Sequence, residues 1–165
     1  LMIFKYLKKQ SYIDLSIIIL IFFLDRISKI YILILNEKNL DGDLFNSQFL
    51  NISLTWNSGI AFGLLSFKQE YLYNVITGLI FLVIFYLIIL AFKAKKLRKY
   101  SYLLIVGGGL GNLFDRILYR SVPDFIDFYY NGFHWFIFNI ADIFITIGVI
   151  CLIYDEVFIE KNRNE

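Results

Sequence analysis

Residues 107–142 read GGGLGNLFDRILYRSVPDFIDFYYNGFHWFIFNIAD. Aspartate, arginine and asparagine side chains interrupt a stretch that is otherwise apolar and aromatic. Because an ionisable group inside a membrane span is costly, its presence there indicates a functional site. We therefore take this stretch as the part of the chain around which the rest is organised.

The composition indicates a membrane protein. Of the 165 residues, 59% are hydrophobic and 19% are aromatic, whereas a typical globular domain is about 45–50% apolar. Runs of about 20 apolar residues can each span a hydrocarbon core about 30 Å thick. We predict a single membrane-embedded domain over residues 1–165, with transmembrane helices at 12–35, 72–92, 100–119 and 137–154.

Basic residues predict the orientation of these helices. Residues 93–99 carry five Lys or Arg side chains, and short cytoplasmic loops collect such residues. We expect this loop and both termini on the cytoplasmic side. The first apolar run is too long for the apolar core of a cleavable signal peptide, and no small-x-small cleavage site follows it. We therefore expect it to be an uncleaved span.

Two segments are expected on the outer side. Residues 36–71 are predicted to form a small β platform, because the stretch from Phe49 to Trp56 partly alternates and is rich in β-formers. Pro123 is expected to end the third helix, and the loop that follows carries aromatic residues typical of a membrane interface. His134, the only histidine, is assigned to this aromatic belt.

Polar side chains converge near the outer ends of the helices. Asp25 and Lys29 are four residues apart and can pair on one helix face. Asp124 lies just beyond the third helix, and Asp142 lies within the fourth. At 1.5 Å per helical residue, Asp142 is expected about 7 Å below the outer boundary.

A pair of aspartates can supply the chemistry of a protease. Two carboxylates in a partly dry site cannot easily both be ionised, and a pair that shares one proton provides both an acid and a base for attack of water on an amide. Of four candidates, Asp142 is favoured because it lies inside a span, and Asp124 follows. Asp115 fits a structural ionised carboxylate next to Arg116, and Asp127 fits a charge on a surface loop.

Other chemistries are less well supported by the sequence. One histidine and one cysteine offer no spacing typical of a metal site, so no metal or cofactor is expected. A serine–histidine triad would need His134, which lies in a segment without a nucleophile elbow. The chain has no basic patch with interleaved aromatic residues, so nucleic acid is not an expected partner.

Two other function classes stay open at this point. Intramembrane charges could form an ion or proton relay, although the charged groups were expected only in the outer halves of the helices. Alternatively, the small-xxx-small spacing of Gly107 and Gly111 could serve helix association in an assembly factor. That interpretation explains packing but not the aspartates.

Five short motifs occur in order along the chain: Asp25-x-x-Ser28-Lys29; Asn57-x-Gly59-x-Ala61-Phe62-Gly63; Gly107-Gly108 through Gly111-Asn112-x-x-Asp115-Arg116; Val122-x-Asp124-Phe125; and Phe138-Asn139-x-Ala141-Asp142. Each motif alone is weak, and the ordered set is specific. In these motifs the chain resembles the lipoprotein signal peptidase (signal peptidase II) family of aspartic membrane proteases.

The resemblance implies roles for individual residues. Asp124 and Asp142 would form the catalytic dyad. Residues expected to bind substrate or support the site are Asn57, Gly59, Asn112, Arg116 and Asn139. Asp25, Lys29 and Asp115 would be structural or accessory. Pro123 and Ile143 depart from the family pattern, which bears on local loop geometry and on access to Asp142.

The resemblance also implies a fold, a substrate and a location. The fold would be all-α, with four transmembrane helices, an extracytoplasmic β-cradle at about 36–71 and a short outer helix or loop at about 126–134. The substrate would be a diacylglyceryl-modified prolipoprotein, cut on the amino side of its lipidated cysteine. The enzyme would lie in the bacterial cytoplasmic (inner) membrane, with its active site near the outer leaflet. We expect the chain to act as a monomer.

Overall fold

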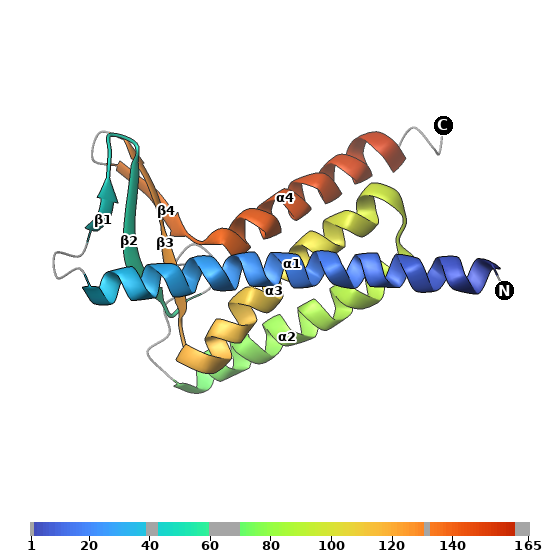
Figure 1. The fold of residues 1–165 in the computed structure, drawn as a ribbon, viewed down its shortest axis with the longest axis horizontal. Coiled ribbons are helices and arrows are strands. Elements are labelled where there is room, and N and C mark those ends of the chain that lie inside the picture. The colour runs from blue at the N-terminus through green and yellow to red at the C-terminus, as the bar shows by residue number, and fades with distance from the viewer. Residues whose placement is uncertain (1, 39–42, 60–69, 131–132, 161–165) are drawn as a thin grey trace.

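Four helices and one small sheet make up the fold of this computed structural model (Figure 1), which describes residues 2–38, 43–59, 70–130 and 133–160. The helices are α1 (Met2–Lys38), α2 (Glu70–Lys93), α3 (Lys96–Tyr119) and α4 (Ile140–Tyr154), and a π-helical segment, Asp155–Glu160, continues α4. The sheet lies at one end of the helices, where α1 and α3 end and α4 begins.

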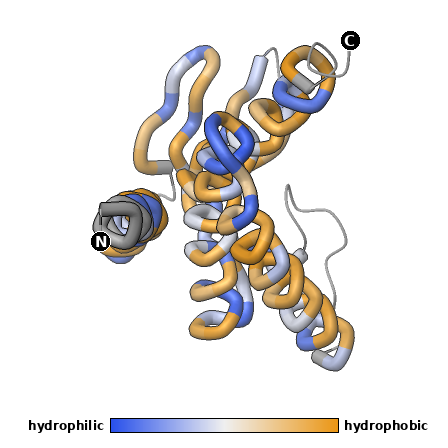
Figure 2. Tube along the Cα trace, turned by 90° about the vertical axis from the view of Figure 1, so that its right-hand side faces the viewer, coloured by the Kyte–Doolittle hydropathy of each residue, from blue (hydrophilic) through white to orange (hydrophobic). Residues whose placement is uncertain are grey.

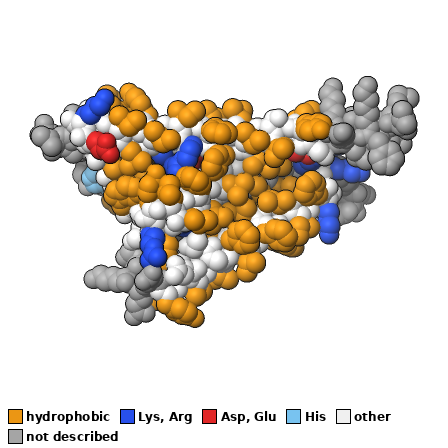
Figure 3. Space-filling model, turned by 60° about the horizontal axis from the view of Figure 1, so that its bottom comes forward, with side chains coloured by type: hydrophobic (Ala, Val, Ile, Leu, Met, Phe, Trp, Pro, Cys, Tyr) orange, Lys and Arg blue, Asp and Glu red, His pale blue; other side chains and the backbone are white. Residues whose placement is uncertain are grey.

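The helices carry their apolar side chains outward. Tyr71–Lys93 in α2 has 23 residues and a mean hydropathy of 3.0, and it is the one helical segment among the described residues that is long and apolar enough to cross a membrane by these measures. Only 11% of its apolar window is buried. The traces of the helices are largely hydrophobic (Figure 2), and apolar side chains cover much of the surface along them (Figure 3).

Helix α3 is the centre of the bundle, since it packs against α1, α2 and α4. Glycines allow this close approach. A Cβ atom on Gly107 would lie 2.8 Å from Cβ of Ile21 in α1, and one on Gly108 would lie 2.5 Å from the carbonyl oxygen of Ala141 in α4. The predicted packing role of Gly107 is therefore confirmed, and Gly108 extends that role to α4.

The sheet joins two outer segments that are far apart in the sequence. Its strands are β1 (Asp43–Asn46), β2 (Leu50–Asn57), β3 (Val122–Tyr130) and β4 (Phe133–Phe138), antiparallel in the order β1-β2-β3-β4. Strand β2 confirms the strand predicted at Phe49–Trp56. In the β2–β3 pair, Thr55 lies opposite Asp124 and Asn57 lies opposite Val122, so the sheet carries both Asn57 and Asp124 to the start of α4.

The short outer helix or loop predicted at about 126–134 is wrong, because this segment contributes to β3 and β4. The all-α class must be corrected accordingly. Aromatic and β-branched residues fit a pleated surface, and β2 offers an edge with which β3 pairs. The motif positions Ala61, Phe62 and Gly63 lie outside the described residues.

The end of the bundle away from the sheet is held by ion pairs. Arg98 lies 2.7 Å from both Asp155 and Glu156, and Lys99 pairs with Asp14. Asp14 is 7% exposed and lies at the end of α1 away from the sheet. The expectation that the helices bury charge only near their outer ends is therefore wrong, although this charge is paired.

Candidate active site

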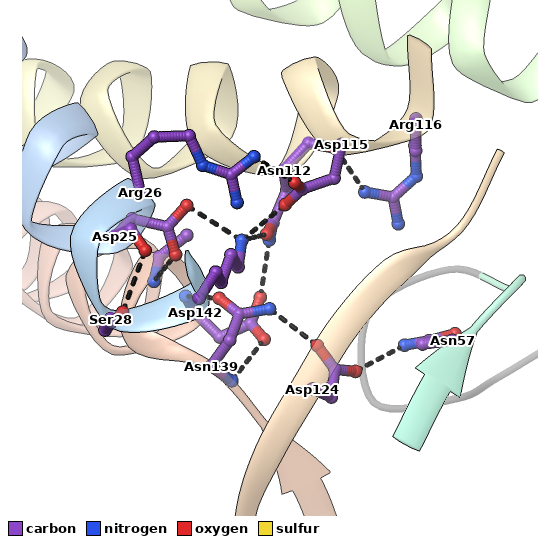
Figure 4. A network of polar contacts seen from close by, with 12 residues as sticks. Asp25, Arg26, Ser28, Asn57, Asn112, Asp115, Arg116, Asp124, Asn139 and Asp142 are labelled. Atoms are coloured by element: carbon purple, nitrogen blue, oxygen red, sulfur yellow. Dashed lines mark hydrogen bonds and ion pairs between the residues drawn. The ribbon is translucent and has the colours of Figure 1, made fainter. Parts of the chain in front are cut away.

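A charge-balanced cluster of two acids and two bases joins α1 to α3. The ammonium group of Lys29 lies 2.8 Å from Oδ2 of Asp25 and 2.6 Å from Oδ2 of Asp115. Arg26 donates from Nη1 to Oδ1 of Asp115 at 2.5 Å. The predicted pairing of Asp25 with Lys29 is confirmed. We call these four residues the ion-pair cluster (Figure 4).

Arg26 was not among the predicted site residues. The partner of Arg26, Asp115, is 89 positions away in the sequence. The only feature near Arg26 that pointed to the site was the neighbouring Asp25. Asp115 is fully buried and pairs with α1, whereas its neighbour Arg116 donates to the carbonyl oxygens of Asn112 and Gly59, each at 3.1 Å.

The start of α4 is fixed by a capping box. Asn139 is the N-cap residue, and its Oδ1 accepts a hydrogen bond from the backbone N–H of Asp142 at 3.2 Å. In return, Oδ2 of Asp142 accepts from the backbone N–H of Asn139 at 3.1 Å. This reciprocal arrangement satisfies donors that the first turn of a helix leaves free, and it fixes the carboxylate of Asp142.

Asparagine amides hold both members of the acid pair, Asp124 and Asp142. Asn139 donates from Nδ2 to Oδ1 of Asp124 at 2.6 Å, and Asn57 donates to its Oδ2 at 2.8 Å. Asn112 donates from Nδ2 to Oδ1 of Asp142 at 2.8 Å. Asn139 therefore bridges the two carboxylates, through its side chain to Asp124 and its backbone to Asp142 (Figure 4).

The acid pair is shielded from solvent. Asp124 is 2% exposed and Asp142 is 6% exposed. Burial, followed by the charge of Asp142, raises the pKa of Asp124 to about 6. The carboxyl group of Asp124 therefore holds a proton at a pH where an ordinary aspartate has lost it.

A cavity of about 420 Å³ opens onto the acid pair. Its polar end is formed by the acid pair and the side chains of Asn57, Asn112, Arg116 and Asn139. The rest of the wall is mainly apolar and comes from α2, α3, β3 and α4: Ile80, Gly109, Val122, Ile145, Thr146, Val149 and Ile150. The predicted catalytic residues thus meet at a cavity with one polar and one apolar end.

Gly59 supports this polar end through its backbone. Its N–H donates to Oδ1 of Asn57 at 2.9 Å, and its carbonyl oxygen accepts from Arg116. The predicted support residues Asn57, Gly59 and Arg116 are therefore linked to one another, and this link fixes the amide that holds Asp124.

Asp127 and His134 form a separate pair on the sheet. Nδ1 of His134 lies 2.7 Å from Oδ2 of Asp127, whose side chain is 3% exposed. The expectation that Asp127 is a charge on a surface loop is therefore wrong. The ring of His134 stacks on Tyr129 with 5.2 Å between centroids. Among the described residues, no group of three His, Cys, Asp or Glu side chains is arranged to hold a metal ion.

Two buried carboxylates that share a cavity and a bridging hydrogen-bond donor form the arrangement of an aspartic hydrolase. The family model described as "Signal peptidase (SPase) II" matches residues 17–158. The chain therefore belongs to the signal peptidase II family and is a protease. Family membership argues against the ion relay and the assembly factor as its main function.

Individual relatives agree with this family. A lipoprotein signal peptidase from Pelagibacter ubique (strain HTCC1062) is 50% identical over 158 residues, which is 95% of each chain. A protein of the same name from Rickettsia bellii (strain OSU 85-389) is 41% identical over 122 residues, covering 72% of this chain and 61% of that protein.

Solved structures of bacterial membrane enzymes share the fold. One has a TM-score of 0.70 at 33% identity and covers 92% of this chain and 91% of its own. A second has a TM-score of 0.65 at 33% identity and covers 88% and 92%, respectively.

Proposed function

We propose that this protein is an aspartic endopeptidase that removes the signal peptide from diacylglyceryl-modified prolipoproteins on the amino side of the lipidated cysteine. Asp124 and Asp142 are the catalytic residues, and water is the nucleophile. The observation that carries this proposal is the acid pair itself, which is buried, bridged by Asn139 and open to a cavity.

The pair works with one shared proton. The ionised aspartate accepts a proton from water as the water oxygen bonds to the scissile carbonyl carbon, and the protonated aspartate gives its proton to the carbonyl oxygen. In the second step the C–N bond breaks. The first aspartate protonates the leaving nitrogen, and a hydroxyl of the intermediate returns a proton to the second. The products are a carboxylic acid and an amine, and the pair regains its starting state.

The shape of the cavity suits a lipid-anchored peptide. Its apolar wall between α2 and α4 accommodates apolar substrate groups, and its polar end holds the scissile bond. A substrate anchored by its own lipid is confined to one depth, which lowers the entropy that must be lost on reaching the site. Asn57, Asn112, Arg116 and Asn139 hold the reacting groups in place at that depth.

We further propose that all four helices cross the bacterial cytoplasmic membrane and that the chain acts as a monomer. The sheet then faces the outer side, and both termini are cytoplasmic. Three observations support this arrangement: the outward apolar side chains (Figure 3), the basic residues 93–99 at the end away from the sheet, and the likeness to solved membrane enzymes.

A cleavage assay tests the function directly. The purified protein in lipid nanodiscs is given a synthetic prolipoprotein peptide with a diacylglyceryl cysteine, and the same peptide without the lipid serves as the control. We expect cleavage of the lipidated peptide on the amino side of its cysteine, detected by mass spectrometry. Equal cleavage of both peptides would refute the lipid requirement, and no cleavage of either would refute the proposed function.

A further inference from the structure

The ammonium group of Lys29 uses all of its hydrogen-bonding capacity in the buried interface between α1 and α3. Lysine has three N–H donors and no acceptor. These donors meet Oδ2 of Asp25 at 2.8 Å, Oδ2 of Asp115 at 2.6 Å and Oδ1 of Asn112 at 2.9 Å. The third contact, to Asn112, connects the ion-pair cluster to the candidate active site.

That contact determines which way the Asn112 amide points. With its oxygen held by Lys29, the amide can offer only its NH₂ group to Asp142, and Nδ2 lies 2.8 Å from Oδ1 of that carboxylate. The reversed amide would set NH₂ against an ammonium group and oxygen against a carboxylate. Both contacts would be repulsive, so Lys29 excludes the reversed orientation.

The two members of the acid pair therefore have unlike surroundings. The amide on Asp142 is backed by the positive charge of Lys29. In the part of the chain that the structure describes, backbone N–H groups contact the oxygens of the two amides on Asp124: Oδ1 of Asn57 accepts from the N–H of Gly59, and Oδ1 of Asn139 accepts from the N–H of Asp142. A donor polarised by a cation favours an ionised acceptor.

Other charged groups nearby do not remove this asymmetry. Asp25 and Asp115 are neutralised within the ion-pair cluster by Lys29 and Arg26. Arg116, a cation that lines the polar end of the cavity, donates to the carbonyl oxygen of Asn112. It lies on the same helix as Asn112 and adds positive charge on the α3 side.

We propose that Lys29 is a positioning residue that acts through Asn112 to keep Asp142 as the ionised member of the acid pair. This inference rests on the proposed function and assigns its two roles. Asp142 takes the proton from the attacking water, and Asp124 protonates the carbonyl oxygen. When the C–N bond breaks, Asp142 protonates the leaving nitrogen and Asp124 regains its proton from the intermediate.

Arg26 provides a matched control for a test of Lys29. Both are buried cations of α1 that pair with Asp115. Arg26 makes its hydrogen bond through Nη1, and its Nε and Nη2 have no hydrogen-bond partner among the described residues. We expect Lys29→Met to lower kcat about 10- to 100-fold with KM unchanged, the range in which loss of an orienting partner acts. Arg26→Met should leave kcat per folded molecule within about threefold of wild type, since a group that does not touch the site contributes little to transition-state binding.

A charge-balanced variant covers the case in which Lys29→Met does not fold. Asp25→Asn combined with Lys29→Met removes one acid and one base and leaves Asp115 paired with Arg26. Its kcat should fall below that of Asp25→Asn alone by the same 10- to 100-fold factor. Equal kcat values for the double variant and for Asp25→Asn would overturn the proposal.

A double-mutant cycle separates positioning from general support of the fold. If Lys29 acts through Asn112, then adding Lys29→Met and Asp25→Asn to an Asn112→Ala enzyme should cost no further kcat beyond the effect of Asp25→Asn. A further loss of the full factor in that background would also overturn the proposal. Wild-type cleavage of the lipidated peptide is measured in the same series. Its absence would refute the proposed function and this inference together, whereas its presence with additive losses refutes the inference alone.

Discussion

Two buried clusters of carboxylates lie on either side of Asn112, and they differ in what surrounds them. In the ion-pair cluster, Asp25 and Asp115 meet an ammonium and a guanidinium group. In the acid pair, Asp124 and Asp142 accept hydrogen bonds from amide groups of asparagine side chains and the backbone. Both clusters are almost fully buried.

The partners of each carboxylate distinguish one that stabilises the fold from one that can take part in acid–base chemistry. A buried acid beside a cation stays ionised and holds helices together, because its charge is matched. A buried acid held by neutral donors next to another acid keeps a high affinity for protons. The cavity opens onto the acid pair, and the residues lining it do not include the ion-pair cluster. The carboxylates that are paired with cations are therefore away from the cavity, and the carboxylates that have no cation partner among the described residues line it.

The largest effect is expected from neutralising the acid pair. Asp124→Asn and Asp142→Asn should each lower kcat/KM by about 10³-fold or more, because general acid–base catalysis contributes about 10²–10⁴-fold. Both proteins should remain folded, as judged by circular dichroism and thermal unfolding in detergent. A variant that keeps a tenth of wild-type activity would remove that residue from the catalytic pair.

The opposite pattern is expected for Asp115 in the ion-pair cluster. Asp115→Asn leaves Lys29 and Arg26 with one acid between them, and breaking a buried ion pair costs about 3–5 kcal/mol. We expect the free energy of unfolding to fall by that amount and kcat per folded molecule to change little. Arg98→Gln, which removes the two partly exposed ion pairs of Arg98 at the end of the bundle away from the sheet, is the control and should cost at most about 1 kcal/mol. Equal losses would contradict the comparison.

A smaller effect is expected from separating α3 and α4. In Gly108→Ala the new methyl group would lie 2.5 Å from the carbonyl oxygen of Ala141, one residue before Asp142. Overpacking of this kind costs about 1–3 kcal/mol, and the shift of α4 should also lower kcat. Among the described residues, a Cβ on Gly78 in α2 meets nothing within 4 Å, so Gly78→Ala should lower neither the free energy of unfolding nor the rate of cleavage. If both variants behave alike, the close α3–α4 contact is not needed.

The smallest and most specific effect concerns pH. Because burial and Asp142 raise the pKa of Asp124 to about 6, Asp124 keeps its proton below that pH and loses it above. The singly protonated pair is then lost as pH rises, so kcat/KM should fall on the alkaline side with a midpoint near pH 6. It should fall again on the acid side when the second carboxyl is protonated. A descending limb centred near pH 4 would contradict this assignment.

The sequence predicted the helices and the acid pair from separate signals. Apolar runs located α2 and α3 to within a few residues. Asp142 was a candidate because a carboxylate inside a membrane span is energetically costly and indicates a functional site. Asp124 ranked above Asp115 because Asp115 lies next to Arg116 and fits a structural carboxylate, and the family resemblance agreed with that choice. What distinguishes these two in the structure is a pair of cations from α1, and Lys29 and Asp115 are 86 positions apart. The residues next to Asp115 in the sequence do not predict a pairing over that separation.

Other features could not be predicted for a similar reason. Strands β3 and β4 are stabilised by pairing with β2, from a different part of the chain, and a short aromatic segment fits a strand, a loop or a belt equally well. Burial of Asp127 depends on the same sheet. The resemblance to the family implied the support residues but not the direction of their amides, which depends on three-dimensional partners.

Asn139 makes the assembly of the acid pair depend on the folding of α4. The hydrogen bonds that begin α4 are also the ones that hold Asp142, and the same side chain reaches Asp124. An unfinished or unravelled chain therefore lacks the assembled acids as well as the helix. We therefore expect cleavage to require a folded α4.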